Sequence, residues 1–166
     1  MAKCCLERKL IGEILVERGL VTAEALDQAL EYQKKLPGVY IGEVLIRLGL
    51  LTEIDIVTAL VVQCNLPFIA ISKHLVDEAV IRLIPAEFAH GHRLIPLDRI
   101  GNVLSIVIVS PIGDQLRSEV EQMTGCQIAL FISTCSEIET ALKRFYPEFP
   151  TNTLSARAGS SSVKDV

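Results

Sequence analysis

Apolar residues recur at helical spacing through the first 63 residues of the chain, and the same order of residues appears twice. The stretch IGEILVERGLVTAEALDQALEYQ (11–33) is followed thirty residues later by IGEVLIRLGLLTEIDIVTALVVQ (41–63). In each copy a short apolar run ends at a glycine, and a longer segment then places apolar residues at i, i+3 and i+4. The pattern predicts a tandem repeat of two αα-hairpins.

Local signals define where these helices begin and end. Gly19 and Gly49 occupy the left-handed position that ends a short helix, and Thr22 and Thr52 are N-caps for the long helices. Thr52-Glu-Ile-Asp55 also approximates a capping box. The apolar face of the long helices is predicted to contain Leu26, Ala29 and Leu30 in the first copy and Ile56, Ala59 and Leu60 in the second. Two repeats rarely close a core alone, so these faces are expected to pack on each other and on the rest of the chain.

The pattern changes after Leu66-Pro67. It predicts an extended segment at 68–71, a helix at 76–83 and a helical turn starting at Pro85, followed by alternating strands and helices. The expected elements are strands 94–99 and 103–109, helix 114–123, strand 127–132 and helix 136–145. Pro96 places the first strand at an edge, and the nearly all-apolar second strand is expected in the centre.

These elements predict an α+β fold in which tandem αα-hairpins pack with a small β-β-α-β-α subdomain. We expect the helical subdomain at 1–70, the α/β subdomain at 71–147, and a flexible tail or linker rich in Ser, Thr, Ala and Gly at 148–166.

Composition narrows the class of protein. The 166 residues carry a net charge of −4, opposite to the basic surface that nucleic-acid backbones attract, so no DNA or RNA partner is expected. Apolar runs such as 106–109 are far too short to span a bilayer, and the opening MAKCCLERK lacks the apolar region of a secretion signal. We therefore expect a soluble, cytoplasmic protein without membrane insertion. The five scattered cysteines predict neither disulfides nor zinc.

The residue types needed for catalysis are not combined in a recognisable way. The phosphate-binding G-x-x-x-x-G-K-[ST] motif is missing, and no Ser/His/Asp or Cys/His combination stands out. His90-Gly-His92 invites a metal interpretation, but this spacing does not place both rings on one helix face, and no third ligand is near. We predict a protein that is not an enzyme and that has no metal site or cofactor.

Polar residues and glycines recur at equivalent places in both copies. Gln33 and Gln63 continue the apolar stripe of each long helix, which indicates either a solvated helix end or a shared polar task. Gly12 and Gly42 lie in the first turn of each short helix, where a missing side chain allows either an anion or a neighbouring helix to approach closely.

The ordered motif I-G-E-x-L-x-x-x-G-L-x-T ending in A-L-x-x-Q, in tandem, resembles the MshEN-type N-terminal domain of type II secretion and type IV pilus assembly ATPases. The segments QCNLPFIAIS, RLIPAEFAHGHRLIPL and GNVLSIVIVSP resemble the same family, so the resemblance covers roughly residues 8–146. It implies that each motif holds one half of the two-fold symmetric ligand cyclic di-GMP.

The resemblance also implies a set of ligand-binding positions. In the first copy these are Gly12, Gly19, Leu20, Leu30 and Gln33, and in the second Gly42, Gly49, Leu50, Leu60 and Gln63. The family motif opens with Arg-Leu-Gly, whereas this chain has Leu10-Ile11-Gly12 and Tyr40-Ile41-Gly42. Arg8 or Lys9 is a candidate substitute for the first arginine, and Tyr40 is a candidate stacking group in the second copy. Ser110-Pro111 replaces the Asp-Pro that often follows the central strand in the family.

Three functions are compatible with these observations. The leading one is a non-catalytic regulatory or adaptor domain that binds cyclic di-GMP. The second is a docking module that has lost nucleotide binding and recruits a secretion or pilus ATPase or its inner-membrane platform protein, since 54–62 has a high apolar content and Asp55 as its only charge. The third, helix-turn-helix DNA binding, is disfavoured because Glu24, Asp27 and Glu31 on the first long helix would repel phosphate.

Overall fold

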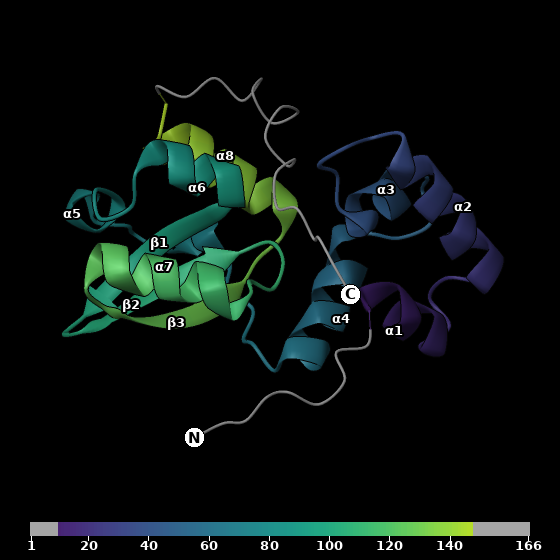
Figure 1. Ribbon diagram of the computed structural model, residues 1–166, viewed down its shortest axis with the longest axis horizontal. Coiled ribbons are helices and arrows are strands. Elements are labelled where there is room, and N and C mark those ends of the chain that lie inside the picture. Colours follow the sequence, from purple (N-terminus) through teal and green to yellow (C-terminus); the bar gives the residue numbers. More distant parts are fainter. Residues whose placement is uncertain (1–9, 148–166) are drawn as a thin grey trace, which may run out of the picture.

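The computed structural model describes residues 10–147, and its first half consists of the two predicted αα-hairpins (Figure 1). The helices are α1 (Ile11–Glu17), α2 (Ala23–Lys34), α3 (Ile41–Arg47) and α4 (Glu53–Cys64). Gly19 and Gly49 have φ angles of +67° and +70°, as expected for glycines that end a helix. The predicted tail at 148–166 lies outside the described residues.

Threonine caps begin both long helices. The backbone N–H of Ala25 donates to Thr22 Oγ1 over 3.2 Å, and that of Asp55 donates to Thr52 Oγ1 over 3.3 Å. In the second repeat the Thr52 N–H also donates to Asp55 Oδ2 over 2.9 Å, which completes the capping box that the sequence predicted. The two repeats therefore begin their long helices alike, with an additional bond in the second.

The second half contains a three-stranded sheet with helices around it. Its elements are a 3-10 turn (Ile71–Lys73), α5 (Glu78–Ile81), α6 (Ala86–His92), β1 (Leu94–Ile100), β2 (Val103–Ile108), α7 (Asp114–Thr124), β3 (Gln127–Ile132) and α8 (Cys135–Phe145). The strand order is β1-β2-β3, with β1 antiparallel and β3 parallel to β2. The α+β class is confirmed, as are the edge position of the strand with Pro96 and the central position of β2.

Two helices differ from the prediction. The helix expected at 76–83 is shortened to α5, because the Asp77 side chain accepts the Ala79 N–H over 2.9 Å and begins the helix at residue 78. The single turn expected at Pro85 is instead α6, a helix of seven residues that buries Ala89 and His90. Tertiary packing extends this helix beyond what its own pattern favours.

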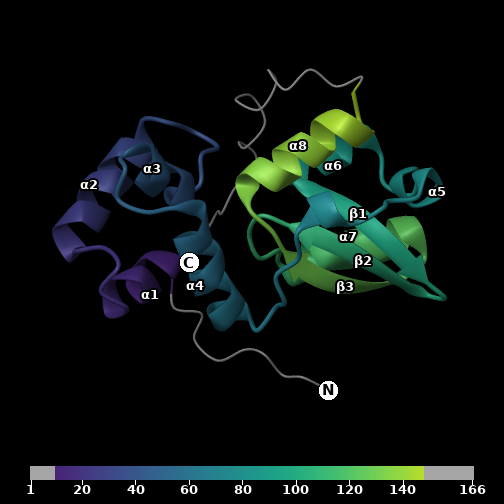
Figure 2. The same cartoon turned by 180° about the vertical axis from the view of Figure 1, so that it is seen from behind.

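Two hydrophobic clusters share α4. The smaller lies among the repeats and includes Leu15, Leu45 and Ala59. The larger surrounds the sheet and includes Val57 and Leu60 of α4. Opposite views show α4 between the other three repeat helices and the sheet (Figures 1 and 2). One helix therefore joins both halves through its two faces.

The segment after α4 runs beside the outer edge of β3. The Ile132 N–H donates to the Pro67 carbonyl and the Ile69 N–H donates to the Ile132 carbonyl, each over 2.9 Å. Phe68 thereby forms a parallel bridge with Ile132. The extended segment expected at 68–71 is shorter than predicted, since the 3-10 turn begins at Ile71. Within residues 10–147, no helix combines the length and apolar character needed to cross a membrane.

Candidate functional site

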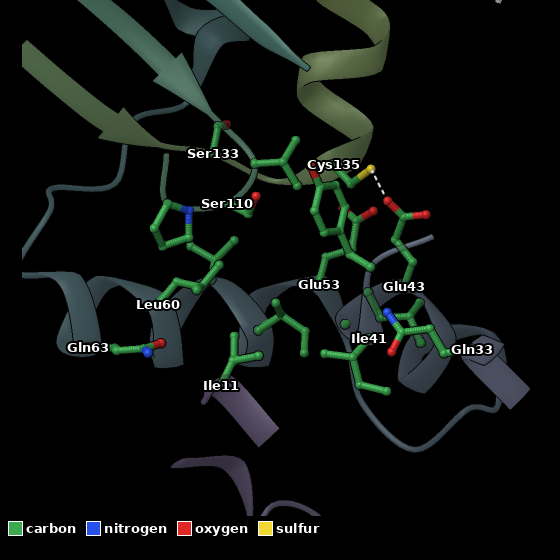
Figure 3. Close-up of a pocket in the computed structure, with 17 residues that line it drawn as sticks. Ile11, Gln33, Ile41, Glu43, Glu53, Leu60, Gln63, Ser110, Ser133 and Cys135 are labelled. Carbon is green, nitrogen blue, oxygen red and sulfur yellow. Dashed lines mark hydrogen bonds between the residues drawn. The ribbon is translucent and has the colours of Figure 1, made fainter. Parts of the chain in front are cut away.

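A cavity of about 310 Å³ lies where the repeats meet the α/β half (Figure 3). The repeats contribute most of its wall, and the segments that directly follow β2 and β3, including the first residue of α8, contribute the rest. The lining residues are Ile11, Gln33, Tyr40, Ile41, Gly42, Glu43, Ile46, Glu53, Ile56, Val57, Leu60, Gln63, Val109, Ser110, Pro111, Ser133 and Cys135. The volume lies at the lower end of the range for ligand pockets, about 300–1,000 Å³.

Equivalent residues of both repeats face this one cavity. Ile11 and Ile41 line it, and so do Gln33 and Gln63, both of which are half-buried. The Gln33 side chain donates from Nε2 to the Val39 carbonyl over 2.7 Å, which fixes its amide beside the cavity. The repeat thus brings one partly buried amide from each copy to the same cavity.

The other candidate positions are divided. Tyr40, Gly42 and Leu60 also line the cavity. Positions away from the lining are Leu10, Gly12, Gly19, Leu20, Leu30, Gly49 and Leu50. Arg8 and Lys9 fall outside the described residues.

Leu30 differs most from its prediction. It was expected on the packed face of α2, yet 39% of its surface is exposed, because α2 has no neighbour comparable to the sheet half that covers Leu60.

Close helix packing accounts for Gly12 and Gly42. A Cβ atom at Gly12 would lie 2.9 Å from Leu26 Cδ2, and one at Gly42 would lie 3.1 Å from Ile56 Cγ2. In the first repeat the start of α1 also has its own anion, since Glu13 Oε2 accepts the Leu10 N–H over 3.0 Å. Of the two alternatives for these glycines, the structure favours contact between helices over an anion site.

Two lining carboxylates were missed by the sequence analysis. Glu53 Oε1 accepts hydrogen bonds from Ser136, over 2.6 Å from its Oγ and 3.3 Å from its N–H. Glu43 forms an ion pair with Arg93. The partners lie 83 and 50 residues away along the chain, so no local pattern could have indicated either contact.

Arg93 lies just outside the lining and contacts three residues that belong to it. It ends α6 in the left-handed conformation with φ of 49°. Besides Glu43, its guanidinium lies 5.6 Å from the centre of the Tyr40 ring, and its Nη1 lies 3.6 Å from Cys135 Sγ. Burial is the largest single effect and opposes the charge on Arg93, but Glu43 and the other acidic groups nearby, Glu139 among them, together outweigh it. The pKa of Arg93 is therefore raised, and the side chain is a cation.

Cys135 is held as a neutral thiol. Burial, with Glu43 as the next cause, raises the pKa of Cys135 to about 12. Its Sγ lies 3.7 Å from Glu43 Oε1, a contact drawn in Figure 3, and 3.6 Å from Glu139 Oε1. A thiol with so high a pKa is a poor nucleophile at neutral pH, so the cavity offers polar recognition and no activated cysteine.

The histidines do not form a metal site with their neighbours. His90 is buried, with Nε2 3.4 Å from the Tyr146 carbonyl, whereas the His92 ring lies 4.5 Å from that of Phe88. Across the part of the chain that the structure describes, no group of three His, Cys, Asp or Glu side chains is arranged to hold a metal ion.

Known proteins share both the sequence pattern and the fold. The MshEN domain matches residues 64–151. The type IV pilus assembly ATPase PilB of Myxococcus xanthus (strain DK1622) is 29% identical over 138 residues, which cover 83% of this chain and 24% of PilB. This chain thus spans about a quarter of the length of that relative.

Solved structures of proteins from the same family have a similar fold. A structure of MshE with cdg is similar with a TM-score of 0.70 and 30% identity, covering 84% of this chain and all of that chain. The N-terminal domain of XpsE shares the fold, with a TM-score of 0.68 at 23% identity over 84% of this chain and 99% of its own. The resemblance to N-terminal domains of type II secretion and type IV pilus assembly ATPases is confirmed. The chain belongs to the MshEN domain family.

Proposed function

We propose that this chain is a non-catalytic regulatory domain that binds cyclic di-GMP in the cavity between its repeats and its α/β half. The observation that carries the proposal is the pairing of equivalent lining residues, Ile11 with Ile41 and Gln33 with Gln63. A two-fold symmetric dinucleotide presents the same groups twice, and a duplicated motif can meet each half with the same side chains. The similarity to MshE with cdg supports this ligand.

The lining chemistry suits guanine. A glutamine amide has both donors and an acceptor, and guanine offers acceptors at N7 and O6 and a donor at N2. Apolar side chains such as Ile56 and Leu60 supply a surface on which a base can lie. The cavity volume of about 310 Å³ accommodates part of the ligand, and the rest would extend along the repeats.

Calorimetric titration of the 166-residue chain with cyclic di-GMP tests the proposal. We expect saturable binding, and at a ligand concentration of about one hundred times the dissociation constant the free energy of unfolding should rise by about 2.7 kcal/mol. Gln33→Ala and Gln63→Ala should each weaken binding about tenfold through loss of a polar contact.

Gln28→Ala is the matched control, because Gln28 is an exposed amide on α2 outside the lining. Absence of both heat and a melting shift at millimolar ligand would contradict the proposal, as would equal effects of Gln28→Ala and Gln33→Ala.

A specific surface favours docking as the second candidate function. Ile54 and Val62 of α4 are 60% and 58% exposed, and Thr58 lies between them on the same helical stripe. The equivalent positions in α2 are Glu24, Gln28 and Tyr32, so only the second repeat has an uncharged β-branched stripe.

We propose that the α4 stripe recruits the cytoplasmic part of a secretion or pilus platform protein, or an ATPase of such a system. A purified platform fragment should bind the native chain and lose binding to Ile54→Glu/Val62→Glu, while Glu24→Gln should bind normally. If the native chain, the double variant and Glu24→Gln all bound the fragment equally, the α4 stripe would be excluded as the docking surface.

A further inference from the structure

The charge of the cavity wall is opposite to what a phosphodiester needs. Glu43 and Glu53 line the cavity, whereas none of the seventeen lining residues is Lys, Arg or His. Two carboxylates repel an anionic ligand, the more strongly in a half-buried site. Among the described residues, a cation for the ligand would have to come from outside this lining.

Arg93 is a cation that lies directly outside the lining of the cavity. It is nearly covered, with 12% of its side chain exposed, and its ion-pair partner Glu43 is 14% exposed. Tyr40, Glu43 and Cys135 all contact the guanidinium and all line the cavity. Three side chains that line the cavity therefore contact this buried positive charge directly.

We propose that Arg93 is the cationic contact for a phosphodiester group of the ligand, and that Glu43 occupies this guanidinium in the ligand-free chain. Binding then exchanges one ion pair for another. The inference rests on the proposed function, and it assigns Glu43 the role of an internal competitor that sets the affinity of the site.

The geometry supports replacement of Glu43 by the phosphodiester as the partner of Arg93, more than addition of the ligand to an unchanged ion pair. An ion as buried as Arg93 is costly without a partner, and in an exchange it has one at every stage. The Glu43 carboxylate already faces the cavity, so it can turn toward water in the cavity when a phosphate oxygen takes its place. Arginine is suited to this role because its planar fork binds carboxylate and phosphate in the same way.

Glu53 does not compete in this manner. Its Oε1 accepts two hydrogen bonds from Ser136 at the start of α8, and no basic side chain is among these contacts. The Glu43–Arg93 pair also joins the repeats to the α/β half. If its role were purely structural, Glu43→Gln and Arg93→Gln would change the affinity in the same direction or not at all. The effects of Glu43 and Arg93 substitutions on affinity therefore separate the two roles.

The experiment is calorimetric titration of the full chain and its variants with cyclic di-GMP at low and high salt. Glu43→Gln, which retains the shape of the side chain and removes its charge, should tighten binding about tenfold. Arg93→Gln should weaken binding by more than about tenfold and reduce the salt dependence of the affinity. Arg93→Lys should give an intermediate affinity, because it retains the charge without the fork.

Arg82→Gln is the control, since it removes the same charge from an exposed pair with Glu78 on α5. If Arg93→Gln fails to fold, as judged by circular dichroism, the role of Arg93 in binding is tested instead by the affinity of Arg93→Lys and by the salt dependence of binding to the native chain. Unchanged affinity in the Arg93 variants, or weaker binding by Glu43→Gln, would overturn the inference and leave the proposed function intact. No binding by the native chain or by Glu43→Gln at millimolar ligand would overturn the proposed function itself.

Discussion

The two repeats have the same frame and different surroundings. Their short helices have seven residues each and their long helices twelve, and a threonine begins both long helices. Yet Leu30 is 39% exposed, whereas its equivalent Leu60 is 4% exposed and belongs to the cluster around the sheet. Local rules thus specify the hairpin, and they leave open which neighbours the hairpin acquires.

One difference between the repeats lies on the face of the long helices that in α4 packs against the α/β half. Asp27 and Glu31 of α2 are exposed, whereas the equivalent residues of α4 are Val57, which is buried, and Val61, which is half-buried against the sheet cluster. Charged residues keep this face of α2 in water, and valines let α4 pack against the α/β half. Two substitutions thus distinguish an outer repeat from a connecting one.

The largest expected effect comes from giving the second repeat the charge of the first. Val57→Asp should lower the free energy of unfolding by about 4 kcal/mol, because it places an unpaired carboxylate in the sheet cluster. The reciprocal change Asp27→Val should alter stability by less than about 0.5 kcal/mol, since that face of α2 is exposed. Urea unfolding measures both values, and similar effects would contradict the asymmetry of the repeats.

A smaller effect is expected where the repeats are alike. Gly42→Ala should destabilise the chain by about 1 kcal/mol net, since crowding against the stiff Ile56 outweighs the gain in helix propensity. Gly12→Ala should cost less, because the crowded atoms belong to the end of the more flexible Leu26 side chain.

Gly91→Ala in α6 is the control for these two substitutions. A Cβ atom there meets nothing within 4 Å, so this variant should be more stable than the native chain in thermal melts. Stabilisation by all three alanines would show that the glycines are not needed for packing.

The smallest effect concerns the capping box that begins α4 and has no counterpart at the start of α2. Hydrogen bonds from Thr52 lower the pKa of the Asp55 carboxyl below its ordinary value of 3.8. A lowered pKa in the folded state contributes stability above the ordinary value, and the contribution is lost as the pH falls through the folded pKa. Asp55→Asn should therefore reduce the urea midpoint at neutral pH and match the native chain in strong acid.

Asp27→Asn is the control for this titration, because Asp27 is an exposed aspartate of the first repeat, where Ala25 stands at the position equivalent to Asp55. Because it lies on the exposed face of α2, this substitution should change the urea midpoint at neutral pH by less than Asp55→Asn does. A constant difference between Asp55→Asn and the native chain from neutral to acid pH would contradict the role of the carboxylate.

Much of the fold could be predicted because its signals are local. Threonine caps, glycines at helix ends and apolar periodicity located all four repeat helices, and β3 has the predicted bounds. The failures are α5 and α6, which are short segments with little periodicity. Gly91 weakens the intrinsic propensity of α6, and burial of Ala89 and His90 against the larger core compensates.

In the candidate site, the residues that could be predicted from the sequence lie mainly at equivalent positions of both repeats. Gln33 and Gln63 were found because they recur, whereas Ser133 and Cys135 reach the cavity through the path of the chain after β3. The Glu43–Arg93 pair joins α3 to the residue that ends α6, which is 50 residues away along the chain. Pairwise contacts of this kind leave no periodic trace in a single sequence.

The short segment that follows α4 restricts how far the repeats can move relative to the α/β half. Only Asn65, Leu66 and Pro67 separate α4 from the bridge between Phe68 and Ile132, so the connection has little slack. A rotation of α4 larger than these three residues can absorb would strain the two backbone bonds to Ile132 at the end of β3. The end of β3 is followed directly by Ser133 and Cys135, which line the cavity. A displacement of the repeats would therefore be transmitted along the backbone to this part of the cavity wall.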